Sequence, residues 1–156
     1  MGPVKQLPYG RWAMARINHQ PSDMWGGPPG QDGFPFHHAV VEPAGRRVHV
    51  TGQVAWDAEM NVMGIGDPAV QTHAALDNIV KVLSGLGGSL DDIVAMTTYY
   101  LRDEDYASIT AVRADRLSND FGPATTGIRV AGLVAPDLLV EITATAVIPE
   151  ARFTAG

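Results

Sequence analysis

At 156 residues, the chain is long enough for one domain around a single hydrophobic core. Hydrophobic residues make up 46% of the sequence and charged residues 18%, proportions that are typical of globular proteins and exclude a disordered chain. The formal net charge of −6 comes without a cluster of Lys and Arg. We therefore expect no nucleic-acid partner, because binding to phosphates requires clustered cations.

The sequence contains no cysteine, which excludes disulfide bridges, thiolate metal ligands and a cysteine nucleophile. No apolar run reaches the roughly 18 residues that a membrane-spanning helix needs. The first residues also lack the charged-then-apolar pattern of a secretory signal. We expect a soluble, cytoplasmic protein without a membrane partner.

Residues 1–35 contain six prolines and six glycines, and so they predict an irregular N-terminal arm. Its large apolar side chains, such as Trp12 and Trp25, suggest that the arm lies across the domain or across a neighbouring subunit. A short strand over residues 11–17 would be its only regular piece. The domain itself is predicted to span residues 36–149, and residues 150–156 form a C-terminal tail.

Helices and strands alternate through the predicted domain. Asp67 is a plausible N-cap ahead of a helix whose apolar residues recur at intervals of three and four. Strands are expected over residues 36–42, 47–54, 93–101, 124–133 and 138–148, and helices over residues 67–86 and 105–120. The first two strands flank a turn signal, Pro43 to Gly45, and are predicted to pair as a hairpin.

This order predicts an α+β fold in which both helices pack on one face of a mixed sheet. The strands carry apolar residues and threonine on both alternating sets. We therefore expect the second face of the sheet to be buried by self-association, most simply in a closed cyclic assembly.

Glu141 is the only acid in the strand predicted over residues 138–148. A carboxylate in such an apolar run needs a partner or a polar cavity, unless the strand lies at an edge and the side chain faces water. Both alternatives remain open from the sequence.

The histidines do not form a metal site in this pattern. His37 and His38 are adjacent, so they point to opposite faces of a strand and cannot both reach one ion with His49. No spaced set of Asp, Glu and His completes a site. We predict hydrogen-bonding or structural roles for them, no metal and no cofactor.

Several segments, taken in order, resemble the Rid/YjgF family, also called endoribonuclease L-PSP. The matching segments are residues 50–54 (VTGQV), 71–80 (QTHAALDNIV), 88–94 (GSLDDIV), 97–101 (TTYYL), 106–109 (YASI), 122–124 (GPA), 140–144 (VEITA) and 146–149 (AVIP). The resemblance implies a chorismate-mutase-like homotrimer with a small-molecule cleft between adjacent subunits. In its best-known branch, the family hydrolyses imines and enamines to a ketoacid and ammonia.

The resemblance also assigns site residues. Glu141 matches the family glutamate that acts around the attacking water, and it is the predicted catalytic residue. Thr125 follows Pro123 and Ala124, where the family has an arginine that binds the substrate carboxylate. Phe36 corresponds to an aromatic residue with a hydroxyl, or His38 does if the hairpin has no extra residues.

Two further family positions fall on Thr51 and Thr110. Arg129 lies four residues beyond Thr125, so both are on one face of the strand, about 13 Å apart at ~3.3 Å per residue. Arg129 could bind an anion in the cleft or pair with a surface acid.

The resemblance predicts an enzyme that deaminates an imine, an enamine or a related labile metabolite. Thr125 cannot form the charged fork of an arginine, which argues against the usual 2-iminoacid substrates. The alternative is a non-catalytic trimer that binds a small ligand in the same cleft. Ribonuclease activity is disfavoured by the acidic chain.

Overall fold

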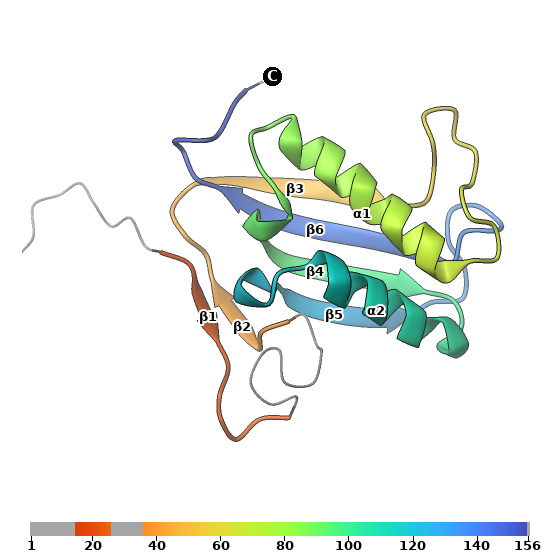
Figure 1. Ribbon diagram of the computed structural model, residues 1–156, viewed down its shortest axis with the longest axis horizontal. Coiled ribbons are helices and arrows are strands. Elements are labelled where there is room, and N and C mark those ends of the chain that lie inside the picture. The colour runs from red at the N-terminus through yellow and green to blue at the C-terminus, as the bar shows by residue number, and fades with distance from the viewer. Residues whose placement is uncertain (1–14, 26–35, 156) are drawn as a thin grey trace, which may run out of the picture.

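The computed structural model describes residues 15–25 and 36–155, and it has two helices on one face of a four-stranded sheet (Figure 1). The strand order is β3-β6-β4-β5, in which β4 and β5 are parallel and the other pairs antiparallel. The elements of this layer pair are β3 (Arg46–Gln53), α1 (Pro68–Ser84), η1 (Leu90–Asp92), β4 (Ile93–Tyr100), η2 (Asp103–Asp105), α2 (Tyr106–Arg116), η3 (Asn119–Phe121), β5 (Ala124–Arg129) and β6 (Val140–Ile148). The α+β prediction is confirmed. No helix in the described part of the chain is long and apolar enough to cross a membrane.

Helix α1 begins where the sequence predicts. Oδ1 of Asp67 accepts hydrogen bonds from the backbone N–H groups of Ala69 and Val70, each at 3.0 Å, which satisfies two donors that the first turn leaves unpaired. The apolar stripe of α1 buries Leu76, Ile79 and Leu83 completely against the sheet. Each such side chain contributes about 1.5–3 kcal/mol of hydrophobic stabilisation.

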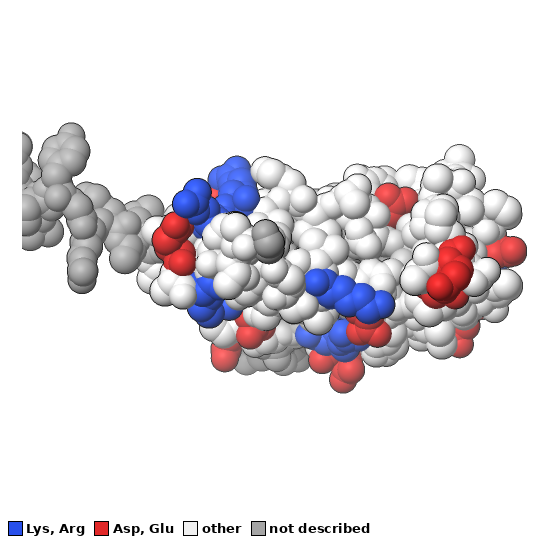
Figure 2. Space-filling view, turned by 90° about the horizontal axis from the view of Figure 1, so that it is seen from above, with Lys and Arg blue, Asp and Glu red and all other residues white. Residues whose placement is uncertain are grey.

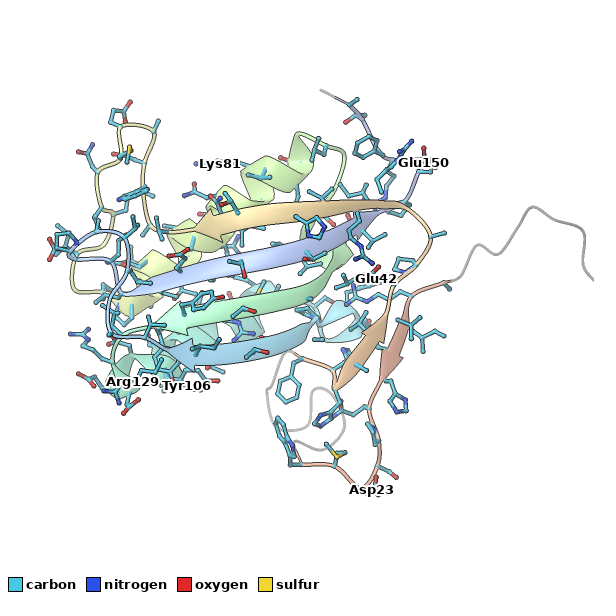
Figure 3. All side chains as sticks on the ribbon, turned by 180° about the vertical axis from the view of Figure 1, so that it is seen from behind. Asp23, Glu42, Lys81, Tyr106, Arg129 and Glu150 are labelled. Atoms are coloured by element: carbon cyan, nitrogen blue, oxygen red, sulfur yellow. The ribbon has the colours of Figure 1, made fainter. Side chains whose placement is uncertain are left out.

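Alternation along β6 separates the two faces of the sheet. Ile142, Ala144 and Ala146 are buried beneath the helices. Glu141 and Thr143 therefore lie on the opposite face, which no helix covers (Figure 3). Threonines dominate this second face, which is more polar than the sequence pattern suggested.

The predicted hairpin between the first two strands of the domain is wrong. β2 (Ala39–Val41) pairs antiparallel with β1 (Ile17–His19) in a separate two-stranded sheet, while β3 pairs with β6. Gly45 fits the pairing of β3 with β6, because a Cβ at this position would overlap the carbonyl oxygen of Ile148 in β6. The missing side chain lets the chain approach the end of β6 closely and enter the sheet there.

Two other predicted elements end earlier than expected. α2 stops at Arg116, since Leu117 has an extended backbone and turns its side chain into the core, and Ser118 then caps η3 by accepting a hydrogen bond from the N–H of Asp120. β5 stops at Arg129 rather than residue 133. Of the strand predicted over residues 11–17, residues 11–14 lie outside the described part of the chain.

Candidate functional site

A pocket with a volume of about 150 Å³ lies between α2 and the edge strand β5. Its walls come from Tyr106, Thr110 and Arg113 of α2, from Thr125 and Gly127 of β5, and from Trp25 and Phe36. The structure thus brings together three of the predicted site residues, Phe36, Thr110 and Thr125. A pocket of this volume fits a small molecule of a few heavy atoms.

The helical and strand periods place these groups. Residues 106, 110 and 113 are spaced by four and three, so they share the face of α2 that is turned toward β5. Thr125 and Gly127 are spaced by two and share one face of β5. Gly127 leaves room for the neighbouring ring, because a Cβ there would lie 3.1 Å from the hydroxyl oxygen of Tyr106.

Arg113 is the functional candidate that sequence reasoning missed. Arg113 is only 3% exposed, and its Nη2 donates a hydrogen bond to Oγ1 of Thr125. Its Nε has no hydrogen-bond partner, and no carboxylate forms an ion pair with it in the described residues. Burial removes water from the guanidinium and lowers the pKa of Arg113.

A signal for Arg113 was present in the sequence. It follows Ile109 and Val112 on the buried stripe of α2, where a charged side chain is unusual unless it has a partner. Thr110, one turn earlier, also has a buried hydroxyl oxygen without a hydrogen-bond partner. The pocket wall therefore carries two polar groups whose hydrogen-bonding capacity is incompletely used.

His37 fixes Phe36 at the pocket. The backbone N–H of His37 donates to the carbonyl oxygen of Pro123 at 3.1 Å, and its ring Nδ1 lies 2.7 Å from the carbonyl oxygen of Gly122. Gly122 and Pro123 immediately precede β5, so these bonds hold the segment beside Thr125. His37 has the hydrogen-bonding role that the sequence suggested.

The other wall is aromatic. The rings of Trp25 and Phe36 have centroids 5.5 Å apart, and the ring of His38 lies 4.7 Å from that of Trp25. Nε2 of His38 contacts the carbonyl oxygen of Trp25 at 2.8 Å. Phe36 rather than His38 therefore lines the Arg113 pocket. Among the described residues, no group of three or more His, Cys, Asp or Glu side chains could hold a metal ion.

Arg16, which directly precedes β1, binds to the backbone of the domain. Its Nη1 donates to the carbonyl oxygen of Asp91 at 2.8 Å, and its Nη2 donates to the carbonyl oxygens of Phe121 and Gly122 at 2.8 and 3.0 Å. Arg16 adjoins β1, which pairs with β2 and so carries the chain toward Phe36. The two-stranded sheet thereby supports one side of the pocket.

Glu141 lies apart from this pocket. It is in register with Tyr99 of β4 on the face of the sheet away from the helices, and it lines a separate hollow with Val130, Leu133 and Val134. Its carboxylate packs against Gly52, where a Cβ would overlap Oε1. Thr51 is exposed beside Gly52. Within one chain, Glu141 and Thr51 thus belong to a different surface from Thr125.

Arg129 forms an ion pair at the surface. Its Nη1 lies 2.8 Å from Oδ2 of Asp103, and the two side chains are 60% and 71% exposed. Arg129 does share the helix-side face with Thr125, as strand alternation requires. An ion pair this exposed contributes little to stability, and Arg129 does not line the Arg113 pocket.

Charges of both signs are interspersed on the face of the molecule shown in Figure 2. Several basic side chains are paired with acids, as in Arg46 with Glu150 and Arg116 with Asp77. The buried guanidinium of Arg113 differs from these pairs in lacking a carboxylate partner among the described residues.

Comparison with known proteins places this fold. The family model of endoribonuclease L-PSP matches residues 33–148. The chain is 40% identical over 100 residues to the 3-aminoacrylate deaminase RutC of Acinetobacter baylyi, a match that covers 64% of this chain and 77% of that protein.

Solved structures agree with that match. The crystal structure of YyfB from Yersinia pestis, a protein of unknown function of the conserved Rid protein family, has a TM-score of 0.73 and 32% identity, covering 86% of this chain and 100% of that one. RidA from an Antarctic Psychrobacter bacterium has a TM-score of 0.61 and 28% identity, covering 72% of this chain and 88% of that one.

The mixed sheet with two helices on one face therefore defines an α+β protein of the Rid type. The chain belongs to the endoribonuclease L-PSP family, the Rid/YjgF family of the sequence comparison above.

Proposed function

We propose that the chain is a hydrolytic deaminase that acts on a small imine or enamine. The observation that carries this proposal is the pocket of Arg113, Thr110 and Thr125, whose size and polar wall suit a small polar substrate. The deaminase activity in the name of the RutC relative supports the reaction class.

The reaction needs water and a group that moves protons. Water adds to the carbon of the C=N bond of the imine, or of the imine tautomer of an enamine, and the resulting carbinolamine expels ammonia to leave a carbonyl. Glu141 accepts the proton from the attacking water and returns a proton to the departing nitrogen. Its carboxylate suits this role because it lies beside the backbone of Gly52 at an accessible hollow.

We further propose a homotrimer in which the Glu141 hollow of one subunit faces the Arg113 pocket of the next. The separation of Glu141 and Thr125 on opposite faces of the sheet supports this arrangement, because one chain alone would not hold both groups against one substrate. The uncovered face of the sheet offers a surface for such contacts (Figure 3).

An ammonia-release assay with 2-aminoacrylate generated in situ tests the function. Wild-type protein should release ammonia faster than the spontaneous reaction, and Glu141→Gln should reduce the enzymatic rate by about 100-fold or more. Glu150→Gln is the matched control, because Glu150 pairs with Arg46 on the surface. A wild-type rate equal to the spontaneous rate would contradict the proposal.

One observation favours a second candidate, a ligand-binding protein without catalysis. The Arg113 pocket is formed within a single chain and does not need Glu141. Such a protein would bind small ligands with equal affinity in wild-type and Glu141→Gln forms and release no ammonia.

A further inference from the structure

The guanidinium of Arg113 is buried, and no described residue supplies it with a counter-charge. Its only hydrogen bond to a described residue joins Nη2 to Oγ1 of Thr125, a neutral group, and its Nε is left without a partner. Removing a cation from water is costly unless an anion and several hydrogen bonds compensate it. Among the described residues, Arg113 thus has hydrogen-bonding and charge capacity that is left unused.

A purely structural role does not require the charge. A neutral side chain of similar length could pack between α2 and β5 and would avoid the cost of burying a cation. Six other arginines of the described residues, by contrast, each meet a carboxylate: Arg46 with Glu150, Arg47 with Glu42, Arg102 with Asp105, Arg116 with Asp77, Arg129 with Asp103 and Arg152 with Asp92. None of these six lines the pocket, whereas Arg113 does.

The groups around Arg113 complement a carboxylate. The guanidinium offers N–H donors in a planar fork, and the Thr125 hydroxyl lies beside it in the pocket wall. Oγ1 of Thr125 accepts from Arg113, which leaves its own O–H free to donate. A carboxylate has only acceptors, so it complements a wall that presents the guanidinium and the Thr125 hydroxyl.

We propose that Arg113 binds the carboxylate of the substrate, so that the pocket selects imines or enamines that carry a carboxylate next to the reacting group. The identity of the reacting group rests on the proposed function, whereas the binding of the carboxylate does not. Thr125 stands where the sequence resemblance expects an arginine, and Arg113 supplies the same charge from the neighbouring helix.

The experiment is a calorimetric titration of the full chain with stable probes: acetate, pyruvate and 2-oxobutanoate, with pyruvamide as the neutral counterpart of pyruvate. The proteins are wild type, Arg113→Met, Arg113→Lys and, as a matched control on the same helix, Arg116→Met. Arg116 pairs with Asp77 at the surface of the helix pair and does not line the pocket.

Wild type and Arg116→Met should bind pyruvate with the same affinity. Both should bind pyruvamide at least about 10-fold more weakly than pyruvate. Arg113→Met should weaken pyruvate binding by about 10- to 100-fold, and Arg113→Lys, which keeps the charge but not the fork, should fall between the two. Arg113→Met should melt at or above the wild-type temperature, because it removes an uncompensated buried charge.

Three results would overturn the proposal: unchanged pyruvate binding in Arg113→Met, equal binding of pyruvate and pyruvamide, or no binding of any of the carboxylates by wild type. If Arg113→Met does not fold, Arg113→Lys decides. Carboxylate recognition by Arg113 would be excluded if Arg113→Lys bound pyruvate as tightly as wild type does and also bound pyruvate and pyruvamide equally. These results are independent of turnover. Carboxylate binding without ammonia release contradicts only the deaminase.

Discussion

Arg113 and Thr125 join the second helix to the edge strand: Nη2 of Arg113 donates a hydrogen bond to Oγ1 of Thr125. Thr125, the neutral residue of β5 at the position where the family has an arginine, is thus in direct contact with the charged guanidinium of Arg113 on α2. A substitution at either residue changes the surroundings of the other, so their effects should not be additive.

Replacing Thr125 by arginine should therefore harm the protein, although it restores the residue that the family pattern expects. Thr125→Arg would bring a second guanidinium against Arg113 in a small pocket, and we expect it to lower the free energy of unfolding by about 3 kcal/mol. Thermal or urea unfolding measures the loss. Ala111→Arg, at an exposed position of α2, is the control.

Exchanging the two residues should rescue that variant. In Arg113→Thr combined with Thr125→Arg, one guanidinium again faces one hydroxyl, so both stability and pyruvate binding should return most of the way to wild type. Binding that remains lost in the exchanged protein would show that the position of Arg113 on the helix matters as well as its charge.

Gly52→Ala should impair turnover by moving Glu141. A Cβ at position 52 overlaps Oε1 of Glu141, so the carboxylate must leave its position, and ammonia release should fall by about 100-fold, a loss typical of a displaced acid–base group. Gly132→Ala is the matched control, because a Cβ there meets nothing within 4 Å. Equal rates in Gly52→Ala and wild type would contradict a role for the Glu141 carboxylate in this position.

Gln71 should matter for stability rather than for chemistry. Its fully buried side chain donates to the carbonyl oxygens of Asp137 and Gly64, at 2.7 and 3.2 Å, and accepts from the N–H of Leu139 at 2.8 Å. Gln71→Leu leaves these backbone groups without partners and should lower the free energy of unfolding by about 3 kcal/mol. Ser84→Ala, at the exposed end of the same helix, should change it little.

Local signals made α1 predictable. Asp67 as a cap, a proline in the first turn and the apolar stripe are all encoded within a few residues of where they act. The hairpin failed for the opposite reason. The alternation in residues 47–54 identifies a strand but not its partner, β6, which lies about a hundred residues further along the chain and approaches Gly45 closely at Ile148.

The candidate site also combines local features that the sequence shows with non-local features that it does not. Alternation along β6 is visible in the sequence and separates Glu141 from its neighbours Val140 and Ile142. The face on which Thr125 lies depends on the parallel register of β5 with β4 and on the packing of α2, which are non-local. The burial of Arg113 in its pocket likewise needed the packed structure, although its place on an apolar stripe marked it as unusual.

The most direct test of a shared site is to mix two inactive variants. Glu141→Gln and Arg113→Met should each have little ammonia-release activity alone. Co-expressed with different tags and purified through both tags, the mixed trimers should recover about a third of wild-type activity, because in a cyclic trimer of either 2:1 composition one of the three clefts combines intact Arg113 of one subunit with intact Glu141 of the next. Mixed trimers as inactive as the separate variants would contradict a catalytic site built from the Arg113 pocket of one subunit and Glu141 of the next.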